Sequence, residues 1–192
     1  MSTADPIRKK EEIEKIKDYF LKNQRWRDYV LFTLGINTSL RISDLLFLRW
    51  KDVYDFEHGK FLDHIQLIEK KTLKTTTIAL NSNAINALQI LMDTIIECSP
   101  MHFIIKSREG ENRPIHRSRA FSIIKKAAHE TGVNGTICCH SLRKTFGYHA
   151  WKKGVPPAVI MDIYNHSSME ITKIYLSINQ DDKDEVFLNL LL

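Results

Sequence analysis

Two short segments of the sequence each hold an arginine in a setting that suits phosphate chemistry. Arg41 lies in Leu-Arg-Ile-Ser-Asp-Leu (40–45), an apolar stretch where a helix is expected to begin. Helical spacing puts Arg41 and Asp44 on one face, so the carboxylate can fix the guanidinium. His140 and Arg143 repeat this spacing in His-Ser-Leu-Arg. Each arginine thus has a polar neighbour on its own helix face.

A third segment supplies candidates for proton transfer and nucleophilic attack. His166 follows Asn165 and lies nine residues before Tyr175. An imidazole can move a proton near neutral pH, and a phenol oxygen can act as a nucleophile. Taken singly, each residue has a structural alternative: an ion pair for Arg41, a hydrogen-bonded polar group for either histidine, a packed ring for Tyr175.

Other catalytic patterns are missing from the sequence. Cys138-Cys139-His140 invites a metal site, but no second Cys/His pair stands at ligand spacing. There is no Walker loop, no Gly-rich dinucleotide loop, no Gly-x-Ser-x-Gly and no paired acidic cluster for Mg²⁺. The sequence therefore predicts no metal and no cofactor. Three cysteines cannot form a disulfide framework, and with no signal peptide or membrane span in the sequence they favour the cytoplasm.

The positive charge is concentrated in one stretch. The 192 residues carry 28 basic and 23 acidic side chains, for a net charge of +5. Residues 106–126 hold seven of the basic and two of the acidic ones, which accounts for the whole excess. Such a stretch suits a nucleic acid, although a solvated loop is the alternative. The predicted DNA-binding residues are Lys106, Arg108, Arg113, Arg117, Arg119, Lys125 and Lys126, with Lys144 beside Arg143.

The elements that must position these groups are mainly helices. Apolar periodicity predicts helices over 9–21, 27–35 (with Gly35 as its stop), 43–50, 83 to about 99, 118–128, 141–152, 157–164 and 170–176. Alternating residues over 60–68 and 75–80 predict an antiparallel hairpin with a Lys-rich loop at 70–74. The predicted fold is α+β: mainly helical, with a small hairpin or three-stranded sheet, in one domain.

In chain order, these segments resemble the boxes of the tyrosine recombinase (phage integrase) family, from about Thr38 to about Ser177. The family signature is an arginine box, a lysine in a β-hairpin, a His-x-x-Arg box, a third histidine and a tyrosine. These positions fall on Arg41, Lys71, His140, Arg143, His166 and Tyr175. Lys71-Thr72 matches the residues that the family usually has in this hairpin, and Lys74 in the same loop remains the alternative.

The resemblance implies that Tyr175 attacks a DNA phosphate without metal or ATP, leaving a 3′-phosphotyrosine and a free 5′-hydroxyl. Arg41 and Arg143 would hold the non-bridging oxygens. His140 would manage the tyrosine proton and His166 would donate a hydrogen bond to the phosphate. Lys71 would protonate the leaving 5′-oxygen, and Asp44 would orient the arginine and the histidine.

Three residues depart from the family pattern. Asn165 stands where glycine is usual, but asparagine is among the few residues that tolerate positive φ. Tyr164 replaces a usual leucine, and Lys144 stands where histidine is frequent. No catalytic group is lost, so an active enzyme is expected.

The two ends of the chain also shape the prediction. Most members carry a helical domain ahead of the catalytic one, but only 40 residues precede Arg41, and 1–36 read as leading helices of the catalytic domain. We therefore expect 1–192 to be one catalytic domain without an N-terminal core-binding domain, and its DNA binding to be sensitive to salt. The apolar tail at 178–192 is expected to dock on a neighbouring copy; folding back on its own domain is the alternative.

The resemblance thus implies a site-specific recombinase or integrase from a bacterium, phage or mobile element. It is expected to act on double-stranded DNA as a dimer or tetramer, and a monomer in solution is left open. Two alternatives remain open. One is DNA relaxation of the type IB topoisomerase kind, which uses the same chemistry. The other is a non-catalytic DNA-binding regulator on the same fold.

Overall fold

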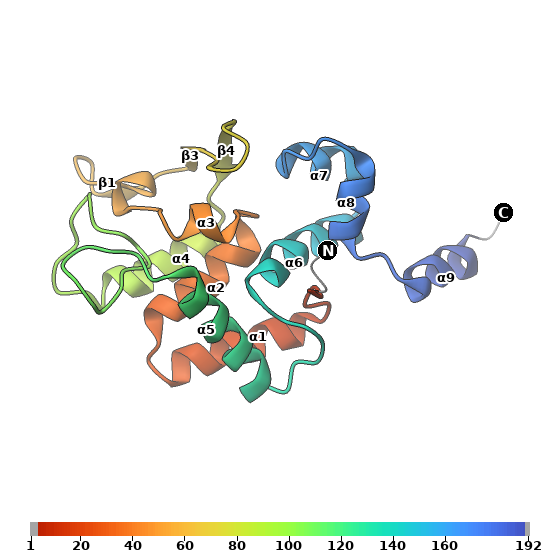
Figure 1. Ribbon diagram of the computed structural model, residues 1–192, viewed down its shortest axis with the longest axis horizontal. Coiled ribbons are helices and arrows are strands. Elements are labelled where there is room, and N and C mark those ends of the chain that lie inside the picture. The colour runs from red at the N-terminus through yellow and green to blue at the C-terminus, as the bar shows by residue number, and fades with distance from the viewer. Residues whose placement is uncertain (1–3, 191–192) are drawn as a thin grey trace.

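The computed structural model describes residues 4–190, and most of them are helical (Figure 1). The predicted mainly helical architecture with small antiparallel sheets is confirmed. In chain order the elements are α1 (Lys10–Lys22), α2 (Trp26–Asn37), α3 (Ile42–Leu45), the 3₁₀ helix η1 (Trp50–Asp52), β1 (Tyr54–Asp55), β2 (Lys60–Phe61), β3 (His64–Ile68), β4 (Thr75–Ala79), α4 (Ser82–Met92), α5 (Arg117–Glu130), α6 (Cys139–Lys152), α7 (Pro157–Ile163), α8 (Met169–Leu176) and α9 (Gln180–Asn189).

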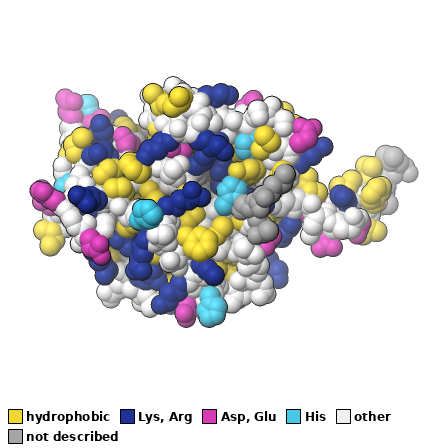
Figure 2. Space-filling view, in the orientation of Figure 1, with side chains coloured by type: hydrophobic (Ala, Val, Ile, Leu, Met, Phe, Trp, Pro, Cys, Tyr) yellow, Lys and Arg dark blue, Asp and Glu magenta, His cyan; other side chains and the backbone are white. Residues whose placement is uncertain are grey.

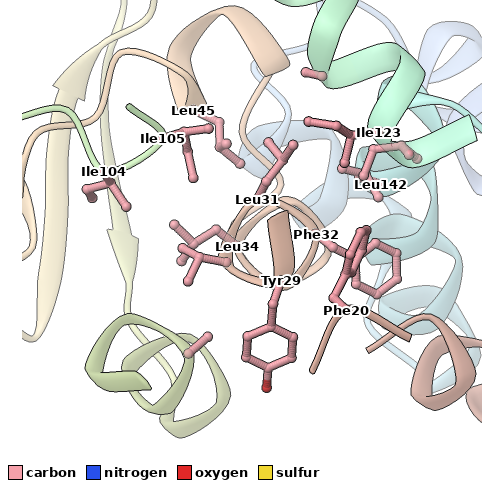
Figure 3. Close-up of a cluster of buried hydrophobic side chains, with 14 of the residues drawn as sticks. Phe20, Tyr29, Leu31, Phe32, Leu34, Leu45, Ile104, Ile105, Ile123 and Leu142 are labelled. Atoms are coloured by element: carbon pink, nitrogen blue, oxygen red, sulfur yellow. The ribbon is translucent and has the colours of Figure 1, made fainter. Parts of the chain in front are cut away.

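Helix α2 forms the centre of the core. Its apolar residues point in several directions, and α1, α4, α5 and α6 all pack around it. Figure 3 shows Leu31 and Phe32 of α2 close to Phe20 of α1 and Ile123 of α5, and each of these side chains is buried. Burying such a side chain contributes about 1.5–3 kcal/mol, so the surroundings of α2 are the main source of stability.

A glycine lets α2 approach α6. A Cβ atom at Gly35 would collide with the side chain of Leu142 in α6. Helix α2 continues past this residue to Asn37, so the prediction that Gly35 stops the helix was wrong. The close approach brings the Arg41 segment, just after α2, next to the helix that carries Arg143.

The β-structure consists of two short antiparallel pairs. Strand β1 pairs with β2, and β3 pairs with β4 in a register that runs from His64 opposite Ala79 to Ile68 opposite Thr75. The predicted strand over 60–68 is broken because the chain changes partner: Leu62 N–H bonds Val53, whereas the Asp63 carbonyl accepts from Leu80. Among the described residues no three-stranded sheet forms.

Three helix boundaries also differ from the prediction. The expected helix over 43–50 is one turn, α3, because the backbone of 48–51 instead forms hydrogen bonds with that of 100–104. Helix α4 ends at Met92 and not near residue 99. Helix α5 begins at Arg117, one residue before the predicted start, and the His116 side chain caps it by accepting the Ser118 N–H.

The C-terminal helices form a smaller unit beside the main core. Ile160 and Tyr164 of the α7 segment pack with Leu176 of α8, next to α6. Helix α9 extends away from the body in Figure 1. Within the described part of the chain, no helix is both long and apolar enough to cross a membrane.

Candidate active site

Arg41 lies at the start of α3 and reaches two partners from distant parts of the chain. Its Nη1 forms an ion pair with the buried Glu69 carboxylate, at the end of the β3 strand, and its Nη2 donates to the Tyr164 carbonyl oxygen at 3.4 Å. The expectation that Asp44 fixes Arg41 was wrong. Asp44 Oδ1 instead accepts the backbone N–H of Lys70 at 3.1 Å, which ties the hairpin loop to α3.

Glu69 is a site residue that the sequence analysis missed. Burial raises the pKa of its carboxyl, but hydrogen bonds from Thr72 and Arg41 outweigh that effect and hold the pKa below its ordinary value. It is therefore the negative partner of Arg41 at neutral pH. Its only sequence signal is its place two residues before Lys71, at the end of an apolar strand.

Arg143 projects from α6 into the interior and is only 3 % exposed. Its Nη1 donates to the Ser39 carbonyl, and its Nη2 donates to the Tyr164 carbonyl at 2.8 Å. Its buried Nε has no partner among the described residues. Arg41 and Arg143 thus meet at one oxygen, and each guanidinium, with five N–H donors, keeps some free for a phosphate.

The turn that ends α7 fixes the position of the Tyr164 carbonyl oxygen, which both arginines share. Tyr164 caps the helix, Asn165 N–H bonds the Asp162 carbonyl at 2.9 Å, and His166 N–H bonds Met161 at 3.1 Å, the pattern of a Schellman turn. Asn165 has φ 51°, and its side chain donates to Thr76 Oγ1 in β4 at 2.9 Å. The expectation that asparagine supports a positive φ here is confirmed.

Tyr175 of α8 lies between the two histidines. The centroid of its ring is 4.8 Å from that of His140 and 4.5 Å from that of His166, and Arg143 Cζ is 6.0 Å away. His166 Nδ1 is 3.1 Å from Thr172 Oγ1, one turn before the tyrosine. The structure therefore brings together five of the predicted catalytic residues: Arg41, Arg143, His140, His166 and Tyr175.

Both histidines are uncharged at neutral pH. Burial is the main cause that lowers the pKa of His140 to about 4, with added repulsion from Lys144 and Arg143. Burial and the two arginines likewise lower the pKa of His166 to about 4. A neutral imidazole can accept a proton through one nitrogen and donate a hydrogen bond through the other.

The hairpin loop that carries Lys71 is anchored near the arginines but exposed. Thr72 Oγ1 donates to Glu69 at 2.6 Å, and Lys70 Nζ lies 2.7 Å from the centroid of the Phe47 ring. Lys71 and Lys74 are both exposed and form no ion pair within the described part of the chain. Within the described residues, no ion pair or side-chain hydrogen bond joins either lysine to the cluster around Tyr175. Both remain candidates for the proton donor.

The basic stretch is divided among several places. Four of its residues line a cavity of about 1150 Å³: Lys106, Arg108, Arg119 and Lys126. Arg25, just before α2, and Arg27, in the first turn of α2, line the same cavity. Arg113 lines a second hollow, Lys125 is exposed on α5, and the charge of Arg117 acts on His140. Arg25 and Arg27 were missed because they stand outside the charged stretch.

Lys144 of α6 is buried, with only 6 % of the residue exposed. This burial does not fit its predicted DNA-binding role. Its positive charge instead helps to lower the pKa of His140. Nearby, burial raises the pKa of the Cys139 thiol to about 12, so it is protonated at neutral pH. Among the described residues, no group of three or more His, Cys, Asp or Glu is placed to hold a metal.

Comparison with known proteins agrees with this geometry. Residues 8–182 match the model of the phage integrase family. The probable integrase/recombinase YoeC of Bacillus subtilis (strain 168) is 37% identical over 181 residues, which are 94% of this chain and 93% of that protein.

Solved structures share the fold. The crystal structure of XerA recombinase superposes with a TM-score of 0.76 at 18% identity, covering 97% of this chain and 64% of that one. XerH recombinase, in a post-cleavage complex with a palindromic difH substrate, superposes with a TM-score of 0.74 at 17% identity, covering 98% and 52%. This chain therefore spans most of the B. subtilis relative but less than two thirds of these structures.

Proposed function

Because the chain belongs to the phage integrase family of tyrosine recombinases, we propose that it cleaves and rejoins DNA strands with Tyr175 as the nucleophile. The observation that carries this proposal is the position of the Tyr175 ring between two neutral histidines, next to a pair of arginines joined at one carbonyl oxygen. A nucleophile, proton-accepting groups and phosphate-binding groups are then present in one place.

In the cleavage step, the Tyr175 oxygen attacks the scissile phosphorus and the bond from phosphorus to the 5′-oxygen breaks. The electron pair leaves with the 5′-oxygen, which takes a proton from Lys71 or Lys74. Arg41 and Arg143 stabilise the charge on the non-bridging oxygens through their remaining N–H groups. The phosphotyrosine conserves the energy of the phosphodiester, so the reverse step rejoins the strand without ATP.

The histidines complete the proton transfers. His140, next to the Tyr175 ring and neutral at pH 7, accepts the phenol proton as the oxygen attacks. His166, whose Nδ1 is near Thr172, presents its other nitrogen as a donor to the phosphate. The role of His140 requires an uncharged imidazole in the free enzyme, in agreement with its lowered pKa. The role of His166 requires only that the nitrogen facing the phosphate carries a proton.

We further propose that the basic cavity beside α5 binds the phosphate backbone of the flanking duplex. Six arginine or lysine side chains line it against two acidic ones, Asp28 and Glu109. Asp28 is shared between Arg25 at 2.8 Å and Arg27 at 2.9 Å, which holds both guanidinium groups in place. Figure 2 shows Lys and Arg side chains spread across this face of the molecule, a distribution that suits a long polyanion.

Assembly with further copies on double-stranded DNA is part of the proposal. The last turns of α9 expose several apolar side chains although the helix stands apart from its own domain (Figure 1). These are Val186, Phe187, Leu188 and Leu190, with 58%, 80%, 75% and 61% exposed. A second copy of the chain, held nearby by the same DNA, is the partner that we propose covers them.

The test is a covalent adduct. Nicked duplexes drawn from the DNA that flanks the gene trap a cleaved strand on the protein, and denaturing electrophoresis detects the adduct. We expect adduct with the wild-type chain and with Tyr54→Phe, a matched control in β1, and none with Tyr175→Phe. No adduct from any flanking sequence would favour the non-catalytic DNA-binding alternative.

A plasmid assay separates the two enzymatic alternatives. A recombinase exchanges strands between two target sites on one plasmid and yields products of defined size. Relaxation of supercoils without any such product would favour the topoisomerase-like alternative.

A further inference from the structure

The buried side chain of Tyr164 has no role in the mechanism above, yet it lies in the middle of the arginine and tyrosine cluster. It is 0 % exposed, and its ring centroid is 4.4 Å from Arg143 Cζ, 5.0 Å from the His166 ring and 5.2 Å from the Tyr175 ring. We propose that Tyr164 is a positioning residue for strand cleavage, which acts by fixing the guanidinium of Arg143. This inference rests on the proposed function.

Tyr164 holds Arg143 at three points. Its main-chain carbonyl accepts Arg143 Nη2 at 2.8 Å, its ring lies against the face of the guanidinium, and its hydroxyl donates to the Arg143 carbonyl oxygen at 2.5 Å. The head of the arginine and the backbone that carries it are therefore bound by one residue. An arginine side chain fixed in advance loses less conformational freedom when it binds a phosphate.

The aromatic ring of Tyr164 adds a contact with the Arg143 guanidinium that the backbone carbonyl cannot make. Any residue at position 164 provides the carbonyl, but only an aromatic ring offers a negative face to the buried cation. A leucine, which the family usually has here, would lose both the ring contact and the hydroxyl. The ring contact and the hydroxyl hydrogen bond at position 164 are therefore features of this chain that the usual leucine would not provide.

Gly147 gives independent support, because it is fitted to the phenol. A Cβ atom at Gly147, in the middle of α6, would overlap the Tyr164 hydroxyl. Glycine inside a helix is unfavourable relative to alanine, so its presence needs a packing reason. Burial also raises the pKa of the Tyr164 hydroxyl, which keeps it protonated as a donor.

The experiment compares four variants with the wild type: Tyr164→Phe, Tyr164→Leu, Gly147→Ala and the double variant Tyr164→Leu/Gly147→Ala. For each, we would measure the single-turnover rate of adduct formation at saturating DNA, the Kd for DNA, and the Tm. Tyr164→Leu is expected to slow adduct formation about tenfold or more, as for the loss of a desolvated cation–π contact. Its Kd should stay within about threefold of the wild-type value, because the flanking phosphate contacts are untouched.

Tyr164→Phe keeps the ring and should restore most of the rate. Gly147→Ala should lower the Tm in the wild-type background and have little effect when Tyr164 is already leucine, because the overlap is then gone. A loss that is confined to the rate, and that phenylalanine restores, is not expected from general destabilisation.

A second measurement is independent of activity. In the folded protein, the ring current of Tyr164 shifts the NMR signal of the Arg143 guanidinium, and Tyr164→Leu should remove that shift. Wild-type rates for folded Tyr164→Leu, or an Arg143 signal unchanged by it, would overturn the inference. Absence of adduct from the wild type would instead overturn the proposed function, and the NMR result would still decide the contact.

Discussion

The arginine centre and the C-terminal helix of this molecule are built in opposite ways. In the centre, Arg41 and Arg143 are held by Glu69, the Ser39 carbonyl and the Tyr164 carbonyl, which come from different segments. Helix α9 is fixed by Asp182 in its first turn and by an ion pair between Glu185 and Lys152, and its far end exposes apolar side chains. The arginine centre is thus completed within one chain, whereas the last helix leaves apolar side chains exposed, the ones that we propose a second copy covers.

The fixed end of α9 shows how limited its attachment is. Asp182 is buried and accepts from Asn179 N–H at 2.9 Å, Arg8 at 3.3 Å and Lys152 at 3.2 Å. Arg8 also donates to the Ser177 carbonyl at 2.6 Å, just before the helix. These contacts set where α9 leaves the domain, and they bury none of the apolar residues at its far end.

The largest effect is expected from a substitution that disrupts the arginine centre. Arg143→Lys retains the charge but loses the two parallel donors that reach Ser39 and Tyr164. We expect adduct formation to fall about 10²–10³-fold, the range for removing one transition-state donor. Single-turnover assays at saturating DNA measure it. Arg49→Lys, before η1 and outside both the arginine centre and the basic cavity, is the matched control and should retain the wild-type rate. Equal losses in the two variants would contradict the assignment of Arg143.

A change of pH should separate the two regions. The pKa of His140 and of His166 is about 4 in the folded chain and near 6.5 in the unfolded one. As pH falls below 6.5 the unfolded state binds protons first, so the free energy of unfolding decreases between about pH 6.5 and pH 4. The Asp182 anchor behaves differently. Its ion pairs and backbone hydrogen bond outweigh burial and lower its pKa, so its contribution is lost only as pH falls below 3.8.

Thermal unfolding between pH 7 and pH 3 tests this order. His140→Gln should flatten the decrease of Tm between pH 6.5 and pH 4, and Asp182→Asn should flatten only the part below it. His64→Gln, at an exposed residue of β3, is the matched control for the histidine. A Tm that stays constant from pH 6.5 to pH 4 in the wild type would contradict the buried, neutral state of both histidines.

The same contrast explains what the sequence can predict. Arg41, His140, Arg143, His166 and Tyr175 stand in local patterns that resemble the boxes of the family, and it is this resemblance that implies a common site. Glu69 was missed because its partner is 28 residues away and no local pattern links the two. Carbonyl groups have no sequence signature at all, so the junction of the two arginines at Tyr164 required the structure.

The predicted boundaries of the strand and of the basic stretch were wrong for a related reason. The chain at 60–68 alternates like one strand, but its hydrogen-bond partner changes between Leu62 and Asp63, and only tertiary pairing decides such a change. The stretch 106–126 reads as one patch of charge. Its residues nevertheless face different hollows, because a loop and the several faces of α5 carry them.

The smallest effect on the domain itself, and the most selective one, is expected at the end of α9. Phe187→Ser removes an apolar side chain that is 80% exposed, so the free energy of unfolding should change by less than about 0.5 kcal/mol. Complexes of several copies on DNA should nevertheless be lost, because that side chain is proposed to lie in the contact between copies. Gel shifts that resolve single and multiple occupancy, together with thermal unfolding, measure both quantities.

Ile96→Ser is the matched control, since Ile96 is also a fully exposed apolar residue but follows α4, far from α9 in the chain. Removal of residues after Ile178 should likewise abolish complexes of several copies, with one copy still bound per site, but should also lower the Tm because it removes the Asp182 anchor. If Phe187→Ser instead lowered the Tm by several degrees while assembly persisted, α9 would be a part of its own domain. The two regions would then be alike, both completed within one chain.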